Sequence, residues 1–420
     1  MHSTLITNIK CLVNVRETSH ILHGSALAEL PCLENAWLLI EGDEISGYGL
    51  MTDKSIPTTG KQQTIDASGR FVLPAWCDSH SHLVFAASRE EEFIDKIKGL
   101  SYAEIAAKGG GILNSAKKLS ETSEDELFNR AWQRLTEISE QGTGAIEIKS
   151  GYGLTVEGEI KMLRVIKKLK EKSSLHIRST FLGAHTYPVA FKNDHDQYIH
   201  NIIDEMLPVI AAEQLADYMD VFCEDGFFSA AETEVLCRAG LQHGLKPKLH
   251  VNQLNSIGGI EAGLRLNALS LDHLETMPEK DIELLAQASC SGTWKGLCTL
   301  LPTAAFFLRM PYPPARKLID AGCAIALATD YNPGSSPGGN MNFVVSLSCI
   351  QMKMLPEEAI NAATLNGAYA MDYGHILGSI TTGKKANLIF TQPIPSLAYL
   401  PYAFSSNCIN RVMIGGEYIS

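Results

Sequence analysis

The chain has 420 residues, of which 45% are hydrophobic and 20% are charged, so it can bury a large core and is not expected to be disordered. Its formal net charge of −12 and its lack of a basic run argue against nucleic acid or an anionic membrane as partners. The length allows two or three domains by size, although a single α/β barrel commonly occupies about 250 residues.

The ten cysteines indicate a reducing environment. None of them forms a C-x-x-C pair, so neither a zinc knuckle nor a thioredoxin motif is visible. Several lie inside apolar runs, as free thiols in a protein core do. The N-terminus shows no cationic segment followed by a long apolar one, and apolar runs such as 323–328 are too short to span a bilayer. We therefore expect a cytoplasmic protein without a membrane partner.

Both ends of the chain predict short strands separated by turns. Residues 44–48 alternate between apolar and polar, and a similar texture returns at 386–390. We expect residues 1–67 and 376–420 to form one small β-sandwich domain, with the long middle of the chain inserted between them. Helices followed by Gly- and Pro-rich turns would give the same composition, but the two-residue period favours strands.

The middle of the chain, 68–375, alternates between strands and helices. The eight predicted strands end at 82, 149, 182, 223, 251, 272, 301 and 329, and clear helical patterns cover 124–141 and 156–170. Eight alternations predict an α/β fold with a (β/α)8 TIM-like barrel rather than an open, doubly wound sheet. No G-x-G-x-x-G or G-x-x-x-x-G-K-[ST] motif follows a strand, which weakens a nucleotide-binding alternative.

The first barrel strand runs directly into His80 and His82. At the end of a strand, residues i and i+2 point to the same side, so both imidazoles can face one metal ion. An isolated pair of this kind is more often two solvated loop histidines. The buried strand before it, and the further His and Asp residues at later strand ends, favour a metal site.

Polar residues recur where the predicted strands end, which is where such barrels carry their chemistry. The strand ends hold His80 and His82, Lys149, His185, Glu224 and Asp225, His250, Asp272 and His273, and Asp330. A single histidine at such a place is usually a hydrogen-bonded core residue, but recurrence on one barrel is hard to assign to packing. Three imidazoles and one carboxylate suit Zn²⁺ or Fe²⁺ and match Mg²⁺ or Ca²⁺ poorly.

Longer motifs make the chain resemble, over nearly its whole length, the imidazolonepropionase family of the metal-dependent amidohydrolase superfamily. The motifs are His80-Ser81-His82, then 82–93, 109–112, 147–154, 181–185 and 329–335, with His250 and His273. The resemblance implies a cyclic amidohydrolase that opens the ring of 4-imidazolone-5-propanoate with water, giving N-formimidoyl-L-glutamate in histidine degradation. It also implies one zinc or iron ion and a homodimer.

The resemblance also implies a role for individual residues. The metal ligands would be His80, His82, His250 and Asp330; the substrate contacts Arg89, Tyr102, Tyr152, His185, Asn332, Gly334 and Ser335; and the catalytic residues Asp330, His273 and Gln253. The metal and Asp330 would activate a water for attack on the ring carbonyl. His273 would stabilise or protonate the developing oxyanion, and the proton taken by Asp330 would pass to the departing ring nitrogen.

The residue types fit these roles, although each has a plainer alternative. Arg89 presents a planar fork that matches the propionate carboxylate, and its alternative is a surface ion pair with the acidic residues 90–92. Tyr152 lies between two glycines, as a phenol presented from a tight turn does, but packing under the barrel rim is also compatible. The glycines at 109–111 form either a flexible lid or a helix stop.

Two positions narrow the expected chemistry. Members of the family carry Glu or Gln three residues after the strand-five histidine, and here it is Gln253, which cannot exchange a proton at neutral pH. Lys149 lies on the second strand and the fourth offers no lysine, so we expect one metal rather than two bridged by a carbamylated lysine. The competing functions are a related cyclic amidohydrolase or aminohydrolase acting on another ring, and a catalytically silent barrel that binds metal or a metabolite.

Overall fold

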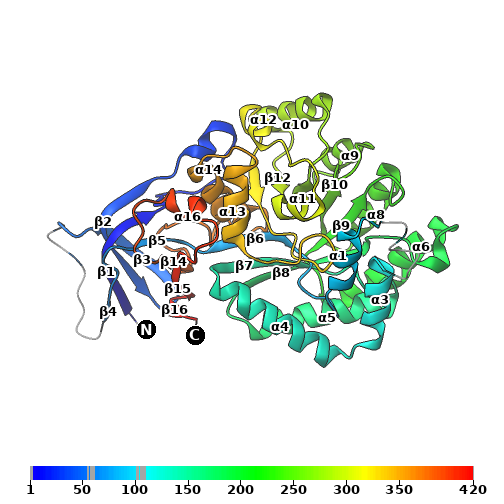
Figure 1. The fold of residues 1–420 in the computed structure, drawn as a ribbon, viewed down its shortest axis with the longest axis horizontal. Coiled ribbons are helices and arrows are strands. Elements are labelled where there is room, and N and C mark those ends of the chain that lie inside the picture. The colour runs from blue at the N-terminus through cyan, green and yellow to red at the C-terminus, as the bar shows by residue number, and fades with distance from the viewer. Residues whose placement is uncertain (1–2, 54–55, 57–61, 101–103, 105–109, 420) are drawn as a thin grey trace.

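Two eight-stranded sheets form the frame of the molecule. The structure, a computed structural model, describes residues 3–53, 56, 62–100, 104 and 110–419. One sheet is parallel and runs in strand order from β6 to β13, while the other combines strands from both ends of the chain. Figure 1 shows the terminal sheet beside the barrel, with helices such as α4, α5, α8 and α10 around the barrel strands. The expected (β/α)8 barrel with a separate sheet built from both termini is therefore confirmed.

The barrel strands pair in sequence order, and the first and last of them meet. Their bounds are β6 Trp76–Ser81, β7 Thr143–Lys149, β8 His176–Ala184, β9 Tyr218–Cys223, β10 Lys246–Val251, β11 Ser270–His273, β12 Leu297–Leu300 and β13 Ile325–Leu327. The backbone N–H of Asp330 donates to His80 O (2.9 Å) and that of His82 donates to Tyr331 O (2.9 Å). These bonds join the chain after β13 to the end of β6, so the first and eighth strand ends come together.

The barrel strands are covered on both faces, and β7 is buried at all seven positions. The helices begin with local capping: Ser123 accepts from Glu126 N before α4, and Thr155 accepts from Gly158 N before α5. No helix in the described part of the chain has the length and apolar character needed to cross a membrane. The α-helices are α1 Glu90–Ile97, α3 Ile112–Glu121, α4 Glu124–Glu140, α5 Val156–Lys172, α6 His195–His200, α7 Leu207–Glu213, α8 Ala230–Gln242, α9 Gly259–Arg265, α10 Glu279–Ser291, α11 Pro302–Leu308, α12 Ala315–Asp320, α13 Met341–Ile350, α14 Pro356–Asn361, α15 Gly367–Tyr369 and α16 Tyr399–Tyr402, with 3-10 turns η1 Gly24–Ala28 and η2 Val189–Phe191 and π-helical turns η3 Asn201–Met206 and η4 Ala362–Asn366.

The terminal sheet has its own apolar core, which includes Ile6, Leu38, Val72 and Leu388. In this sheet β5 lies between β1 and β14, so the two ends of the chain are joined by direct strand pairing. Its strands are β1 Ser3–Val13, β2 Cys32–Glu41, β3 Glu44–Leu50, β4 Gln63–Asp66, β5 Phe71–Pro74, β14 Leu388–Thr391, β15 Ile409–Ile414 and β16 Glu417–Tyr418.

The apolar run before His80 was expected to be a single barrel strand, and this expectation is wrong. The structure divides the run into β5, which pairs with β14 in the terminal sheet, and β6, which pairs with β7 in the barrel. The amide of Ala75 still donates to Asn387 O (2.9 Å), whereas that of Trp76 donates to Gly142 O (2.9 Å). The chain thus passes from one sheet to the other within one residue. The domain boundaries at 67/68 and 375/376 stay a prediction.

Candidate active site

A cavity of about 640 Å³ lies at the carboxyl ends of the barrel strands. Among the predicted site residues, its lining includes His82, Arg89, Tyr152, His185, His250, Gln253, His273, Asp330, Asn332, Gly334 and Ser335. His80 is fully buried and does not line the cavity. Tyr102 and Gly109 lie outside the described residues. Residues more than 250 positions apart in the sequence thus come together in one cavity, of the size that small-molecule sites have.

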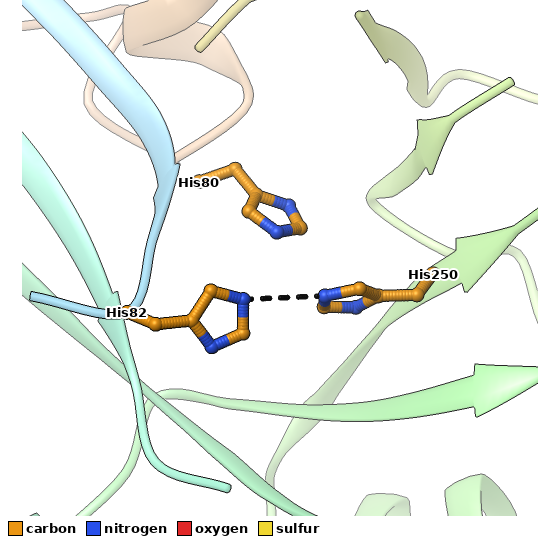
Figure 2. Close-up of side chains that lie close together, drawn as sticks. All are labelled: His80, His82 and His250. Atoms are coloured by element: carbon orange, nitrogen blue, oxygen red, sulfur yellow. Dashed lines mark hydrogen bonds between the residues drawn. The ribbon is translucent and has the colours of Figure 1, made fainter. Parts of the chain in front are cut away.

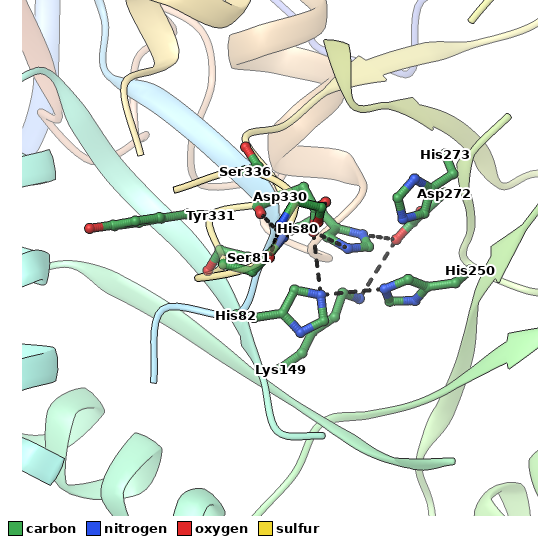
Figure 3. Close-up of polar contacts among 12 residues, drawn as sticks. His80, Ser81, His82, Lys149, His250, Asp272, His273, Asp330, Tyr331 and Ser336 are labelled. Carbon is green, nitrogen blue, oxygen red and sulfur yellow. Dashed lines mark hydrogen bonds and ion pairs between the residues drawn. The ribbon is translucent and has the colours of Figure 1, made fainter. Parts of the chain in front are cut away.

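The four predicted metal ligands converge at one point: three of them line the cavity, and His80 lies buried behind them (Figures 2 and 3). The Nε2 atoms of His82 and His250 are 3.4 Å apart, and Oδ1 of Asp330 lies 3.5 Å from Nε2 of both His80 and His82. The ligand atoms of the three histidines all lie within 4.8 Å of one another, and those of His80, His273 and Asp330 form a second such group. His80 thus belongs to both groups, and Asp330 and His273 both border the imidazole cluster. The assignment of the ligands stays a prediction.

Two buried carboxylates orient the imidazoles. Nδ1 of His80 lies 2.7 Å from Oδ2 of Asp272, and Nδ1 of His250 lies 2.8 Å from Oδ2 of Asp220. A proton on each Nδ1 leaves the lone pair of each Nε2 free to face the cluster. Burial, together with neighbouring positive groups, lowers the pKa of His80, His82 and His250 well below the usual range, so the imidazoles are neutral at neutral pH.

This donor set fits a transition-metal ion. Within the described residues, Nε2 of His80 is buried without a hydrogen-bond partner. The Nε2 atoms of His82 and His250 lie 3.4 Å apart; because Asp220 keeps the His250 proton on Nδ1, either a proton on His82 Nε2 or a cation is needed between them. Neutral imidazoles with one carboxylate are ligands that zinc and iron prefer. A cation bound here would engage Nε2 of His80, which has no hydrogen-bond partner among the described residues.

His273 and Asp330 lie beside the imidazole cluster: the His273 ring centroid is 5.2 Å from that of His250 and 5.6 Å from that of His80, and Asp330 Oδ1 is 3.5 Å from Nε2 of His80. Burial disfavours the imidazolium of His273, but Glu275, whose Oε1 lies 3.2 Å from Nδ1, outweighs this and raises the pKa of His273 to about 9. Burial raises the pKa of Asp330 to about 7. Both residues have left-handed backbone, with φ of 85° at His273 and 53° at Asp330. Such conformations are costly for non-glycine residues and are concentrated at functional sites.

Arg89 reaches the cavity from the start of α1. Its Nε donates to Ser115 Oγ (2.9 Å), while its Nη2 is buried and has no hydrogen-bond partner among the residues described. A Cβ atom at Gly334 would lie 2.4 Å from Nη1 of Arg89, so glycine is needed there for the guanidinium to approach the loop. In the part of the chain that the structure covers, Arg89 forms no ion pair with the acidic residues 90–92. The cavity therefore holds a guanidinium with an unused donor.

Tyr152 and His185 lie side by side, next to His82 of the imidazole cluster. Nδ1 of His185 donates to Gly151 O (2.9 Å), since a carbonyl oxygen only accepts, and this leaves Nε2 as an acceptor. The Tyr152 ring centroid lies 5.5 Å from that of His185 and 6.0 Å from that of His82. The carboxylate of Glu159 accepts hydrogen bonds from three backbone amides of this loop, at 2.7–3.0 Å. The loop that carries Tyr152 is thus held rigidly from α5.

The loop after β13 is held by the side chain of Asn332. Its Nδ2 donates to Asp330 O and Ser335 Oγ (both 2.7 Å), and its Oδ1 accepts from the amides of Gly334 and Ser335 (both 2.8 Å). The amide group of Asn332 is therefore used within the loop itself. Ser335 Oγ also lies 3.3 Å from Asp330 Oδ2 and can orient that carboxylate. The predicted substrate contacts of these loop residues stay predictions.

Several charged residues that support the site were not predicted from the sequence. Asp220, Glu147 and Lys248 are fully buried inside barrel strands, and Glu275 partners His273. A signal was present, because charged residues are rarely fully buried unless paired. Lys248 precedes His250 by two residues, so both face the barrel interior. Asp220 stands in the middle of an otherwise apolar strand.

Known proteins resemble this chain in both sequence and fold. A model described as the amidohydrolase family matches residues 232–419. An imidazolonepropionase from Christiangramia forsetii is 56% identical to this chain, and the match covers 99% of both proteins. One from Flavobacterium johnsoniae is 57% identical, and the match covers 99% of this chain and 100% of that protein. A protein of the same name from Parabacteroides distasonis is 43% identical over 94% of this chain and 93% of its own.

Solved structures share the fold at low sequence identity. An adenosine deaminase from Xanthomonas campestris with bound zinc has a TM-score of 0.71 at 16% identity, covering 99% of this chain and 92% of its own. The guanine deaminase of E. coli has a TM-score of 0.72 at 12% identity, and the match covers 100% of this chain and 99% of that protein. These likenesses concern the architecture alone. The full-length identity of more than half to the Christiangramia forsetii and Flavobacterium johnsoniae proteins shows that the chain belongs to the imidazolonepropionase family of amidohydrolases.

Proposed function

We propose that the protein hydrolyses the ring amide bond of 4-imidazolone-5-propanoate and releases N-formimidoyl-L-glutamate in histidine degradation. The observation that carries this proposal is one cavity in which a cluster of neutral imidazoles and Asp330 lies near the unpaired Nη2 of Arg89. The first feature suits water activation and the second suits a small acidic substrate. The name shared by the full-length relatives supports the same reaction.

The metal would be held by His80, His82, His250 and Asp330, as a single zinc or iron ion. When bound, such an ion supplies a Lewis acid and lowers the pKa of water from 15.7 to about 7. The carboxylates of Asp272 and Asp220 keep the imidazoles of His80 and His250 in the tautomer that presents Nε2.

Asp330 and His273 would divide the proton transfers between them. Asp330 takes a proton from the attacking water and passes it to the ring nitrogen as the carbon–nitrogen bond breaks. His273, held as an imidazolium by Glu275, stabilises or protonates the oxyanion that forms on the ring carbonyl. Gln253 lines the same cavity and orients the ring by hydrogen bonds, because a carboxamide does not exchange protons at neutral pH.

Substrate recognition would depend on both ends of the small molecule. Arg89 binds the propionate carboxylate through its unused Nη2, a charge-assisted bond. His185 accepts a hydrogen bond from the ring at Nε2, and Tyr152 lies beside it. The remaining contacts would come from Tyr102, Asn332, Gly334 and Ser335.

The setting of the enzyme is part of the proposal. We propose two domains, 1–67 with 376–420 and 68–375, a homodimer and a cytoplasmic location. All ten cysteines are free thiols, which supports a reducing compartment. Sedimentation velocity on the purified protein would test the dimer, and a monomer at micromolar concentration would contradict it.

The deciding experiment measures metal content and turnover on the same purified sample. We expect close to one zinc or iron per chain, and conversion of 4-imidazolone-5-propanoate to N-formimidoyl-L-glutamate, followed by mass spectrometry. Adenosine and guanine are assayed separately as substrates, to test the alternative that the protein is an aminohydrolase acting on another ring. A metal-loaded protein that deaminates adenosine or guanine but leaves the imidazolone intact would contradict the proposed reaction, and one inactive on all three compounds would favour the silent barrel.

A further inference from the structure

Five charged side chains form a buried cluster inside the barrel, beneath the proposed metal ligands. We call Glu147, Lys149, Asp220, Lys248 and Asp272 the buried charge cluster. They lie on β7, β9, β10 and β11, and each of the five side chains has 0% of its surface exposed. Three carboxylates and two ammonium groups are thus removed from water together, so each depends on its partners in the cluster.

Lys149 occupies a particular place in this cluster. Its Nζ lies 2.5 Å from Oε1 of Glu147, 2.8 Å from Oδ2 of Asp220 and 3.6 Å from Oδ2 of Asp272. The two aspartate oxygens are the same atoms that lie next to the ring nitrogens of His250 and His80. Figure 3 shows the side chain of Lys149 directed from below toward the imidazoles, with a dashed line to Asp272. One ammonium group therefore faces the orienting carboxylates of two proposed ligands.

We infer that Lys149 is a positioning residue of the metal site: it holds Asp220 and Asp272 where they orient His250 and His80. This inference rests on the proposed function only in that it takes the two histidines as metal ligands. An ammonium has only donors; two of them bond Glu147 and Asp220, and Asp272 Oδ2 lies within ion-pair distance at 3.6 Å. A carbamylated Lys149 would instead place a fourth negative group among the three carboxylates.

Lys248 provides the matched comparison. It is equally buried and also pairs with Glu147, but its other partners are the backbone carbonyls Ser79 O (3.0 Å) and Ala370 O (3.1 Å). Within the described residues it has no ion pair with Asp220 or Asp272. Both lysines therefore compensate buried negative charge, and only Lys149 contacts the carboxylates behind the ligands. A role in positioning and a role in charge compensation thus predict different results for the two residues.

The test compares Lys149→Met with Lys248→Met in the full-length protein. Zn²⁺ affinity is measured by competition with a chromophoric chelator, and kcat and KM are measured with metal in excess. For Lys149→Met we expect a loss of Zn²⁺ affinity of roughly 10- to 100-fold, the usual effect of removing a group that orients metal ligands. At saturating metal, kcat should fall while KM changes little. Lys248→Met should keep its Zn²⁺ affinity within about threefold.

Other outcomes overturn the inference. Unchanged Zn²⁺ affinity in Lys149→Met contradicts it, and an equal loss in both variants assigns Lys149 to charge compensation. If Lys149→Met does not fold, Lys149→Met/Glu147→Gln removes one charge of each sign, and the same affinity criterion decides. The Zn²⁺ measurement needs no substrate, so a protein that binds metal but does not open the imidazolone refutes the proposed function and leaves this inference standing. A wild-type protein that binds no Zn²⁺ overturns the inference.

Discussion

Replacing Arg89 with Met tests how the cavity selects an acidic substrate. Met keeps much of the length of the side chain and removes the guanidinium. In the structure Nε donates to Ser115 Oγ (2.9 Å), whereas Nη2 is buried with no partner in the described part of the chain. Nη2 is therefore a donor left for the propionate carboxylate, and its removal should act on substrate binding rather than on the proposed metal ligands.

The size of the effect follows from the type of bond. A hydrogen bond to a charged group contributes about 1.5–3 kcal/mol, and about 1.36 kcal/mol corresponds to a factor of ten. KM should therefore rise about 13- to 160-fold. Because the carboxylate is remote from the ring bond that breaks, the same contact is kept in the transition state, and kcat should change much less than KM.

The assay measures initial rates against substrate concentration for metal-replete protein, with metal content determined on the same sample. Lys96→Met is the matched control, since Lys96 lines the same cavity but donates to Gly334 O at 3.1 Å. It should raise KM much less than Arg89→Met does. An unchanged KM in Arg89→Met at full metal content would refute the assignment of Arg89 to the carboxylate.

The other predictions concern the proton path and the metal. Asp330→Asn should lower kcat by about 10²- to 10⁴-fold even with metal restored, whereas Gln253→Glu should keep measurable turnover. Both are tested by measuring kcat against pH, with metal content determined on the same samples. A metal-replete Asp330→Asn with wild-type kcat would contradict the proposed proton path. Glu275→Gln removes the charge that raises the pKa of His273 to about 9, so burial then lowers that pKa. Because the imidazolium is lost as pH rises through its pKa, the alkaline limb of kcat/KM should move to lower pH, and an unmoved limb argues against His273 as the acid. Removing the metal with a chelator should lower the unfolding temperature, since a ligand at 100 times its Kd stabilises the fold by about 2.7 kcal/mol. Added zinc or iron should restore the unfolding temperature. An unfolding temperature that chelation does not change would contradict a metal bound in the folded state.

The local sequence pattern predicted the bounds of some barrel strands correctly. The fourth and fifth strands were predicted at 218–223 and 246–251, and the structure has β9 at Tyr218–Cys223 and β10 at Lys246–Val251. β9 is apolar except for Asp220, as expected for a parallel strand covered on both faces, whereas β10 also contains Lys246, Lys248 and His250. The two-residue period of a strand likewise placed His80 and His82 on one side before any contact across the barrel was known.

Contacts between distant segments were decided by the tertiary structure alone. Residues 71–77 are all apolar, so their sequence does not show that they belong to two sheets. The division appears only in their distant backbone partners: the amide of Ala75 bonds Asn387 O and that of Trp76 bonds Gly142 O. The carboxylates behind His250 and His80 come from 30 and 192 residues away. Sequence by itself determined which side chains face the barrel interior, because that depends on a two-residue repeat. Which of them touch depends on the register between strands, which long-range backbone hydrogen bonds set.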